Sequence, residues 1–185
     1  MPPTPNLLLQ KGSVFMSEFK RIDPTEIRDN AFHLIDKDWF LITAEDPASG
    51  AINTMTASWG CIGILWNKPV AVCFIRPQRH TLGFVNAAKR LSLSFLPEQY
   101  RGALRFCGTK SGRDYDKFAE TGLTPAYDEN HTPYVEESRL VLLCKKLYVG
   151  ALEEDGFLDP ELLNHYKERD YHAVFICEIE SVLEK

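Results

Sequence analysis

Four β-like segments follow one another between residues 38 and 75, and only short links separate them. They read "DWFLITAED", "AINTMTAS", "CIGILW" and "PVAVCFI", rich in branched and aromatic residues, with "PASG" and "NKP" as turns between them. Links this short leave no room for the crossover helices that parallel strands require. The pattern therefore predicts hairpins within an antiparallel sheet.

The rest of the chain predicts further strands with helices between them. Strands are expected at "LSLSFL", "SRLVLLCKKLYVGALEE" and "YHAVFICEIESVLE". Helices are expected from Asp23 through "PTEIRDNAFHLI", at "TLGFVNAAKR" with Thr81 as N-cap, at "QYRGALRFCGTKSG", at "RDYDKFAETG" before Gly122, and at "PELLNHYKER". No G-x-G-x-x-G or G-x-x-x-x-G-K-[ST] motif follows a strand. The chain is thus predicted to be mainly β, one antiparallel barrel or sandwich with helical excursions.

Composition excludes several classes of protein. A chain of 185 residues with 44% hydrophobic and 25% charged residues suits one soluble globular domain. The net charge of -5 argues against general nucleic-acid binding, and no apolar stretch is long enough for a membrane span or a signal-peptide core. The five cysteines form no C-x-x-C pair, and the five histidines lack metal-ligand spacing. We expect a cytoplasmic protein with reduced, mostly buried thiols and no metal site.

The first fifteen residues differ in character from the rest of the chain. They carry three prolines and no amphipathic periodicity, whereas Met16 opens the more protein-like "MSEFKRIDPTEI". We expect residues 1–15 to be an N-terminal extension separate from the domain. Two interpretations stay open: the native protein starts at Met16, or the extension is a genuine but poorly ordered arm.

A basic turn, "RPQRHT", ends the apolar run "VAVCFI". Arg76 and Arg79 can each give bidentate hydrogen bonds to a phosphate, and the start of the expected helix adds backbone N–H donors. The site expected here comprises Arg76, Pro77, Arg79, His80 and Thr81. The alternative is an exposed, solvated turn in which Thr81 only caps the helix.

A second segment, "NTMTASWG", offers small residues at the end of a strand. Thr56, Ala57 and Ser58 would let a flat ligand lie against the backbone, and Trp59 could form a wall. Hairpin geometry can bring this segment and the basic turn to one mouth of a barrel, which favours a nucleotide-like cofactor. The alternative is an ordinary strand end with Trp59 in the core.

Two further places could contribute to the same site. In "FCGTKSGRDYDKF", Ser111 opens a polar loop and Lys117 could point back toward the mouth, although the stretch could equally be a linker between helices with Asp114 as N-cap. His172, at the start of the last strand, could reach the site or be a structural histidine.

These stretches resemble the flavin reductase-like family, of which flavoredoxin is a member. "DWFLITAED", "NTMTASWGCIGILWNKPVAVCFIRPQRHT", "FCGTKSGRDYDKF" and "YHAVFICEIE" carry the resemblance, and the pair "MTASWG" and "RPQRHT" is its most specific part. The resemblance implies an FMN-binding, antiparallel Greek-key split barrel over residues 16–185 that forms a homodimer. It implies flavin contacts from Thr56, Ala57 and Ser58, and phosphate contacts from Arg76, Arg79, His80 and Thr81. His172 matches a histidine near the flavin in some relatives, so we assign it the catalytic position; Ser111 and Lys117 match one subgroup only.

The function that the resemblance implies is electron transfer from NAD(P)H to flavin or through bound FMN. In such a protein the cofactor supplies the reactive atom and the chain orients it. Two alternatives stay open: a non-catalytic FMN-binding protein or electron carrier, and a barrel that has lost flavin. We expect the apolar residues Ile62, Ile64, Leu65 and Trp66 to contribute the dimer surface.

Overall fold

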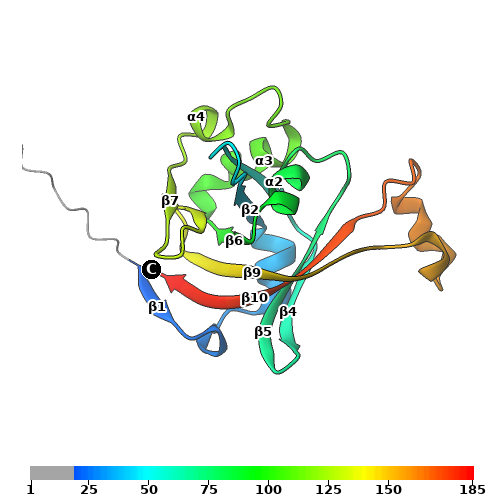
Figure 1. Cartoon of the computed structure of the whole chain (residues 1–185), viewed down its shortest axis with the longest axis horizontal. Coiled ribbons are helices and arrows are strands. Elements are labelled where there is room, and N and C mark those ends of the chain that lie inside the picture. The colour runs from blue at the N-terminus through cyan, green and yellow to red at the C-terminus, as the bar shows by residue number, and fades with distance from the viewer. Residues whose placement is uncertain (1–18) are drawn as a thin grey trace, which may run out of the picture.

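A single curved antiparallel sheet dominates the computed structural model, which describes residues 19–185 (Figure 1). The strands pair in the order β3-β2-β6-β9-β10-β5-β4, and β1 adds to β10. Their bounds are β1 Lys20–Ile22, β2 Phe40–Glu45, β3 Ile52–Ala57, β4 Gly60–Leu65, β5 Lys68–Ile75, β6 Arg90–Phe95, β9 Leu140–Ala151 and β10 Ala173–Glu184. Two short strands, β7 (Pro125–Tyr127) and β8 (Pro133–Val135), pair separately. The expectations for residues 1–15 and for a start at Met16 lie outside the described residues.

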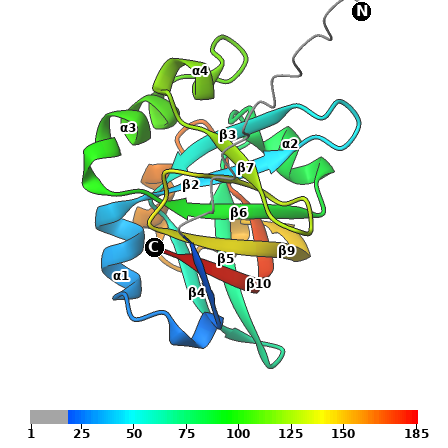
Figure 2. The ribbon, with the colours of Figure 1, turned by 90° about the vertical axis from the view of Figure 1, so that its left-hand side faces the viewer.

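The sheet curls so that its two ends enclose one core. The main cluster of buried residues contains Met55 and Ala57 from β3 at one end, and Ala71 and Cys73 from β5 near the other. β5 and β6 are consecutive strands in the chain but lie apart in the sheet, because β9 and β10 pair between them. Figure 2 shows β3, β2, β6, β9 and β10 one below another, with β4 and β5 running steeply behind them. The predicted mainly β, Greek-key split barrel is confirmed.

The hairpins predicted from the first four strands are confirmed. β2 pairs with β3 and β4 pairs with β5, both antiparallel. The strands β1, β7 and β8 were not predicted. Each has only three residues, so it is too short to show the alternation on which a prediction depends.

The helix predicted from Asp23 is wrong in its extent. Asp23 caps only the 3-10 turn η1 (Pro24–Glu26), and the chain then turns extended at Ile27. A second helix start comes at Asn30, whose side chain accepts hydrogen bonds from the backbone of α1 (Ala31–His33), which continues into the π-helical turn η2 (Leu34–Asp38). The longer helical stretch is therefore capped by Asn30 and not by Asp23.

The predicted cap at Thr81 is also wrong, and so is the cap at Asp114 that the alternative reading of its stretch included. Helix α2 (Thr81–Ala87) has His80 in the N-cap position without a side-chain bond, and Thr81 is its first helical residue. Helix α4 (Lys117–Thr121) is capped by Asp116 rather than by Asp114, because the Asp116 side chain accepts from the backbone of the first turn. Gly122 ends α4 in the left-handed conformation, φ 69°, as predicted.

The remaining helices are short and lie outside the sheet. They are η3 (Glu98–Tyr100), α3 (Arg101–Thr109), η4 (Glu154–Gly156) and η5 (Pro160–His165), the last a 3-10 helix where a short helix was predicted. Within the described residues, no helix has the length and apolar character needed to cross a membrane. All five cysteines are free and four are buried, as predicted; Cys61 is exposed.

The long strands β9 and β10 extend beyond the barrel and carry η4 and η5 at their far end (Figure 1). We call residues 152–172 the arm. Its return segment leads directly into β10, whose first residue, Ala173, pairs with Ile75 at the end of β5. The arm is therefore placed beside the turn that comes after β5.

Candidate functional site

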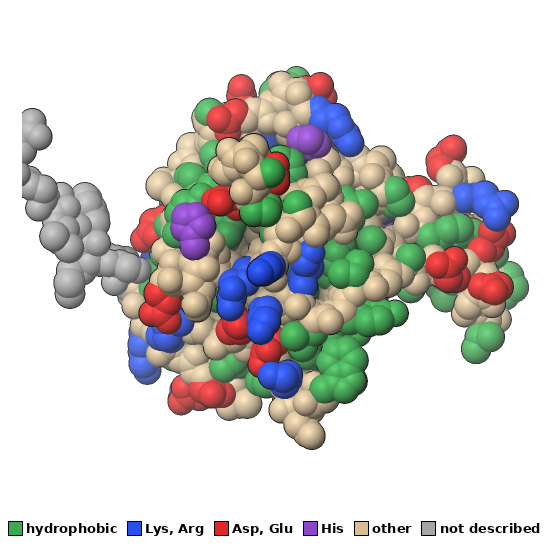
Figure 3. Space-filling model, in the orientation of Figure 1, with side chains coloured by type: hydrophobic (Ala, Val, Ile, Leu, Met, Phe, Trp, Pro, Cys, Tyr) green, Lys and Arg blue, Asp and Glu red, His purple; other side chains and the backbone are tan. Residues whose placement is uncertain are grey.

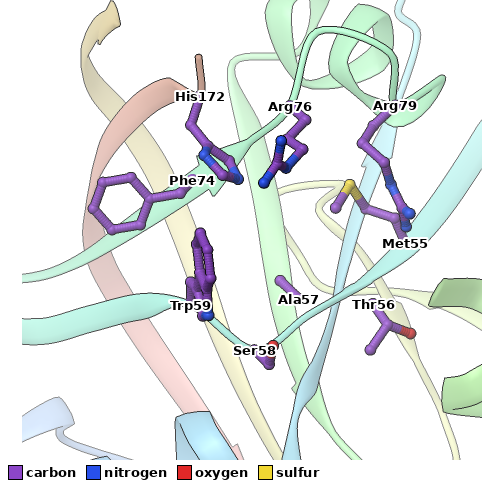
Figure 4. A pocket seen from close by; sticks show the side chains of 9 residues that line it. All are labelled: Met55, Thr56, Ala57, Ser58, Trp59, Phe74, Arg76, Arg79 and His172. Atoms are coloured by element: carbon purple, nitrogen blue, oxygen red, sulfur yellow. The ribbon is translucent and has the colours of Figure 1, made fainter. Parts of the chain in front are cut away.

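A cavity of about 210 Å³ lies where β3 and β5 end (Figure 4). Nine residues line it: Met55, Thr56, Ala57, Ser58, Trp59, Phe74, Arg76, Arg79 and His172. The structure thus brings together seven of the predicted site residues from three separate stretches of sequence. Two of the nine are arginines and none is acidic, so the cavity favours an anionic ligand.

The floor of the cavity is formed by the end of edge strand β3. The carbonyl oxygen of Thr54 accepts from Lys117, so it points away from β2. Residues two apart in an antiparallel strand have the same orientation, so the backbone N–H and C=O of Thr56 also point to this free edge. The small side chains of Ala57 and Ser58 leave room for a flat group against the backbone (Figure 4).

One wall of the cavity is aromatic. The rings of Trp59 and His172 lie 5.4 Å apart between centroids, and the ring of Phe74 stands edge-on to His172. Trp59 is 45% exposed, so it lines the site instead of filling the core. A large, partly exposed aromatic surface beside small residues suits a planar ligand.

His172 is buried and neutral. Its Nδ1 lies 2.9 Å from the hydroxyl of Tyr166 in the arm, and its ring points into the space between Trp59 and Arg76 (Figure 4). Burial, and then the neighbouring charge of Arg76, lower the pKa of His172 to about 4. At neutral pH the ring therefore offers one N–H donor and one acceptor nitrogen, but no positive charge.

Arg76 lines the cavity with its charge already paired. Its guanidinium forms an ion pair with Asp170, donates to the carbonyl of His165 at 2.8 Å, and lies over the ring of Tyr166 at 5.1 Å. Hydrogen bonds from Arg76 and then from Gln78 lower the pKa of Asp170. Arg76 thus fastens the arm to the turn after β5.

Arg79, three residues later, has a different environment. It donates to two backbone carbonyls at the end of α3, that of Gly108 at 2.6 Å and that of Cys107 at 3.2 Å. Among residues 19–185, no carboxylate lies within ion-pair distance of its guanidinium. Burial lowers the pKa of Arg79, so this cation is costly to keep without an anion.

Lys117 does not line this cavity. Its side chain is buried beneath α3, and its ammonium donates to the carbonyls of Thr54 and Cys107, each at 2.9 Å. It lines a neighbouring cavity of about 670 Å³ together with His80 and Arg113. The structure therefore places Lys117 behind the predicted flavin surface instead of on it.

The other predicted residues are spread around the turn. Pro77 and His80 line a third cavity, which shares Arg79 with the first. Thr81 is buried and accepts a hydrogen bond from Asn53 at 3.1 Å, and it is not among the residues that line the first cavity. Ser111 accepts from the backbone of Arg113 in the loop before α4 and is likewise absent from that lining.

Sequence reasoning missed four residues that shape the cavity: Met55, Phe74, Tyr166 and Asp170. Phe74 could have been found from strand alternation, because it is the last outward position of "VAVCFI" before the basic turn. Tyr166 and Asp170 lie in an irregular part of the arm, where no periodicity reports what a side chain contacts.

A family model described as the flavin reductase like domain matches residues 33–185. Flavoredoxin of Desulfovibrio vulgaris (Miyazaki F) is 25% identical with a TM-score of 0.61, over 78% of this chain and 67% of that chain. A putative flavin reductase with a split barrel domain from Shewanella frigidimarina has a TM-score of 0.64 at 21% identity, over 88% of this chain and 77% of the other.

An FMN-binding protein from Thermus thermophilus, with bound p-hydroxybenzaldehyde, is similar over 80% of this chain and 71% of its own, with a TM-score of 0.61 and 21% identity. A search of curated proteins found no match. The region that the family model matches, residues 33–185, includes every residue that lines the cavity. The chain therefore belongs to the flavin reductase-like family.

Proposed function

We propose that this protein binds FMN in the cavity beside β3 and uses it to transfer electrons from NAD(P)H to flavin or through bound FMN. The observation that carries the proposal is the combination, in one cavity, of a free strand edge, an aromatic wall and an arginine without a carboxylate partner among the described residues. The names of the relatives support it, since they include a flavoredoxin and an FMN-binding protein.

The residues of the cavity suit the parts of FMN. The isoalloxazine ring would lie against Ala57 and Ser58, hydrogen-bond to the free backbone groups of Thr56, and contact Trp59. The phosphate would bind Arg79, whose charge no carboxylate of the described residues offsets. Arg76 is the weaker choice, because Asp170 already neutralises it.

Bound FMN would supply the redox chemistry of the proposed electron transfer. The chain contributes orientation and exclusion of water. His172 is the residue that we place next to the reacting group, as a neutral hydrogen-bonding partner. Because its pKa is about 4, it would not serve as a proton donor near neutral pH.

We also propose that the protein is a homodimer. A cavity of about 210 Å³ falls below the usual range for sites that enclose a whole ligand, about 300–1,000 Å³, so one chain would cover only part of FMN. Hydrophobic side chains gather on the surface around the β4–β5 hairpin and the base of the arm (Figure 3). Ile64 and Trp66 are 68% and 55% exposed. A second subunit would cover this surface, and sedimentation at micromolar concentration would reveal a monomer if it does not.

An absorbance spectrum tests the main proposal. The purified protein should take up FMN, and its flavin absorbance should bleach when NADH or NADPH is added without oxygen. Turnover of reduced nicotinamide with added flavin would establish the reductase. Binding of FMN without bleaching would favour the alternative, an FMN-binding electron carrier reduced by another protein, and failure to take up FMN would refute both.

A further inference from the structure

Three side chains donate to carbonyls of α3: Thr56 and Lys117 tie the helix to edge strand β3, and Arg79 ties it to the turn after β5. The hydroxyl of Thr56 donates to the carbonyl of Leu104 at 2.6 Å. Lys117 donates both to β3 and to α3, and Arg79 donates to α3 from the other side. The carbonyl of Cys107 accepts from Lys117 and from Arg79 at once, so the two cations share an anchor.

Burial of the Lys117 ammonium lowers the stability of the folded chain. Its side chain is only 4% exposed, and among residues 19–185 no carboxylate lies within ion-pair distance of it. A buried ammonium that is met by carbonyl dipoles alone destabilises the folded chain relative to an apolar side chain of the same size. Stability therefore does not account for a lysine at this position.

We propose that Lys117 is a positioning residue of the flavin site. Its ammonium clamps β3 to α3, which fixes the backbone of Thr56, and through the shared Cys107 carbonyl it fixes the guanidinium of Arg79. Lys117 acts on the flavin through these two groups and does not itself contact it. This inference rests on the proposed function.

The geometry separates this role from direct phosphate binding. Lys117 is not among the nine residues that line the cavity, and its two acceptors are backbone atoms of the protein. A positioning residue affects the ring site and the phosphate site together. A phosphate ligand affects only flavins that carry a phosphate.

Two variants test the assignment. Lys117→Met keeps the length of the side chain and removes the charge, and Lys110→Met removes the same charge from an exposed position at the C-cap of α3, the helix that Lys117 contacts. Fluorescence titrations with FMN and with riboflavin at pH 7 should show both affinities falling about tenfold in Lys117→Met, as expected for loss of charged hydrogen bonds. Both should stay at the wild-type value in Lys110→Met.

Loss of FMN affinity alone would make Lys117 a phosphate ligand, and no loss for either flavin would make it a buried bystander; each result overturns the inference. If wild type binds neither flavin, the proposed function fails as well. If wild type binds both flavins and Lys117→Met binds them with the same affinities, the inference is refuted and the proposed function is not.

The pH dependence of the wild type gives a second test that needs no variant to fold. Burial, opposed by Cys107 and reinforced by the charge of Arg79, lowers the pKa of Lys117 to about 8. The facing Cys107 thiol has its pKa raised to about 11 by burial, and the pKa of nearby His80 is lowered, so neither gains or loses a proton between pH 7.5 and 9.

The affinity for both flavins should therefore stay constant up to about pH 7.5. It should fall severalfold by pH 9, as the ammonium of Lys117 loses its proton. The Lys117→Met protein should show the same weak affinity at both pH values. A wild-type affinity that is flat through pH 9, or an equal alkaline loss in Lys117→Met, would overturn the inference.

Discussion

The two arginines of one turn face the same cavity and are held in opposite ways. Arg76 meets a carboxylate, Asp170, and an aromatic ring, both from the arm. Among residues 19–185, the guanidinium of Arg79 meets only backbone carbonyls, at the end of α3. A carboxylate cancels a full charge, whereas carbonyl dipoles orient a guanidinium and leave most of its charge available. Residue type alone makes these two positions look equivalent, and their partners make them different.

The same contrast extends to the groups behind each arginine. On the arm side, which comprises Arg76, Tyr166, Asp170 and His172, an ion pair fastens the arm, and Tyr166 holds a neutral histidine against the cavity through a hydrogen bond and an edge-on ring contact. On the helix side, which comprises Arg79, Lys117 and the end of α3, two cations share one backbone acceptor, the carbonyl of Cys107. We expect the arm side to shape the site and the helix side to provide its charge.

The largest effect is expected for Arg79→Ala on the helix side. Loss of charge-assisted hydrogen bonds worth roughly 1.5–3 kcal/mol should lower FMN affinity on the order of tenfold to a hundredfold. Riboflavin, which lacks the phosphate, should bind wild type and variant almost equally. Fluorescence titration of both flavins measures this, and an equal fall for the two would show that Arg79 supports the ring and is not a phosphate ligand.

The second prediction concerns His172 on the arm side. The pKa of His172 is 6.5 in the unfolded chain and about 4 in the folded protein, so the unfolded chain binds the proton more readily. Stability should therefore be fully present above pH 6.5 and decline as the pH falls toward 4. The full difference in pKa corresponds to at most about 3 kcal/mol. Because the ring lines a cavity open to solvent, we expect a decline of about 1–2 kcal/mol.

His172→Gln provides the comparison, because it keeps a polar side chain of similar size and cannot be protonated. Urea unfolding at pH 7 and at pH 4.5 should show that the free energy of unfolding falls less between these two pH values in the variant than in wild type. Identical losses in the two proteins would place the acid sensitivity elsewhere in the chain.

Much of this fold can be predicted from the sequence, because it depends on local signals. Alternation and turn residues predict the hairpins β2–β3 and β4–β5, and the small residues after Met55 predict a floor for a flat ligand. Gly122 ends α4 because a left-handed residue is needed there, which a sequence also reports. The three-residue strands leave no such signal.

The site is less predictable because its contacts join distant residues. Arg76 and Asp170 lie 94 residues apart, and nothing in either stretch indicates the other. The lysine of "RDYDKF" would be expected on a solvated face, since lysine is almost never fully buried, yet Lys117 is inside. The residue types at the turn predict an anion site, and only the three-dimensional partners indicate which arginine is available for it.

Arg76→Ala should sharpen the comparison from the arm side. It removes the partner of Asp170, whose side chain is largely buried, and should lower stability by about 1 kcal/mol. FMN and riboflavin affinities should each fall less than about threefold and to the same extent, because Arg76 fastens the arm and leaves the phosphate to Arg79. A selective loss of FMN affinity as large as that of Arg79→Ala would remove the distinction between the two arginines.

The smallest effect is expected for a glycine on the helix side, Gly112, in the loop before α4. A Cβ there would lie 2.5 Å from Oδ1 of Asn53, a buried side chain that donates to Thr81. Gly112→Ala should displace Asn53 and lower stability by about 1 kcal/mol or less, the usual loss for one hydrogen bond between neutral groups. Gly108→Ala is the matched control, since its Cβ would meet Thr56 at an ordinary 3.4 Å and alanine favours a helix. Thermal melts should therefore rank Gly108→Ala at or above wild type and Gly112→Ala below it, and the reverse order would mean that this loop is not packed against β3.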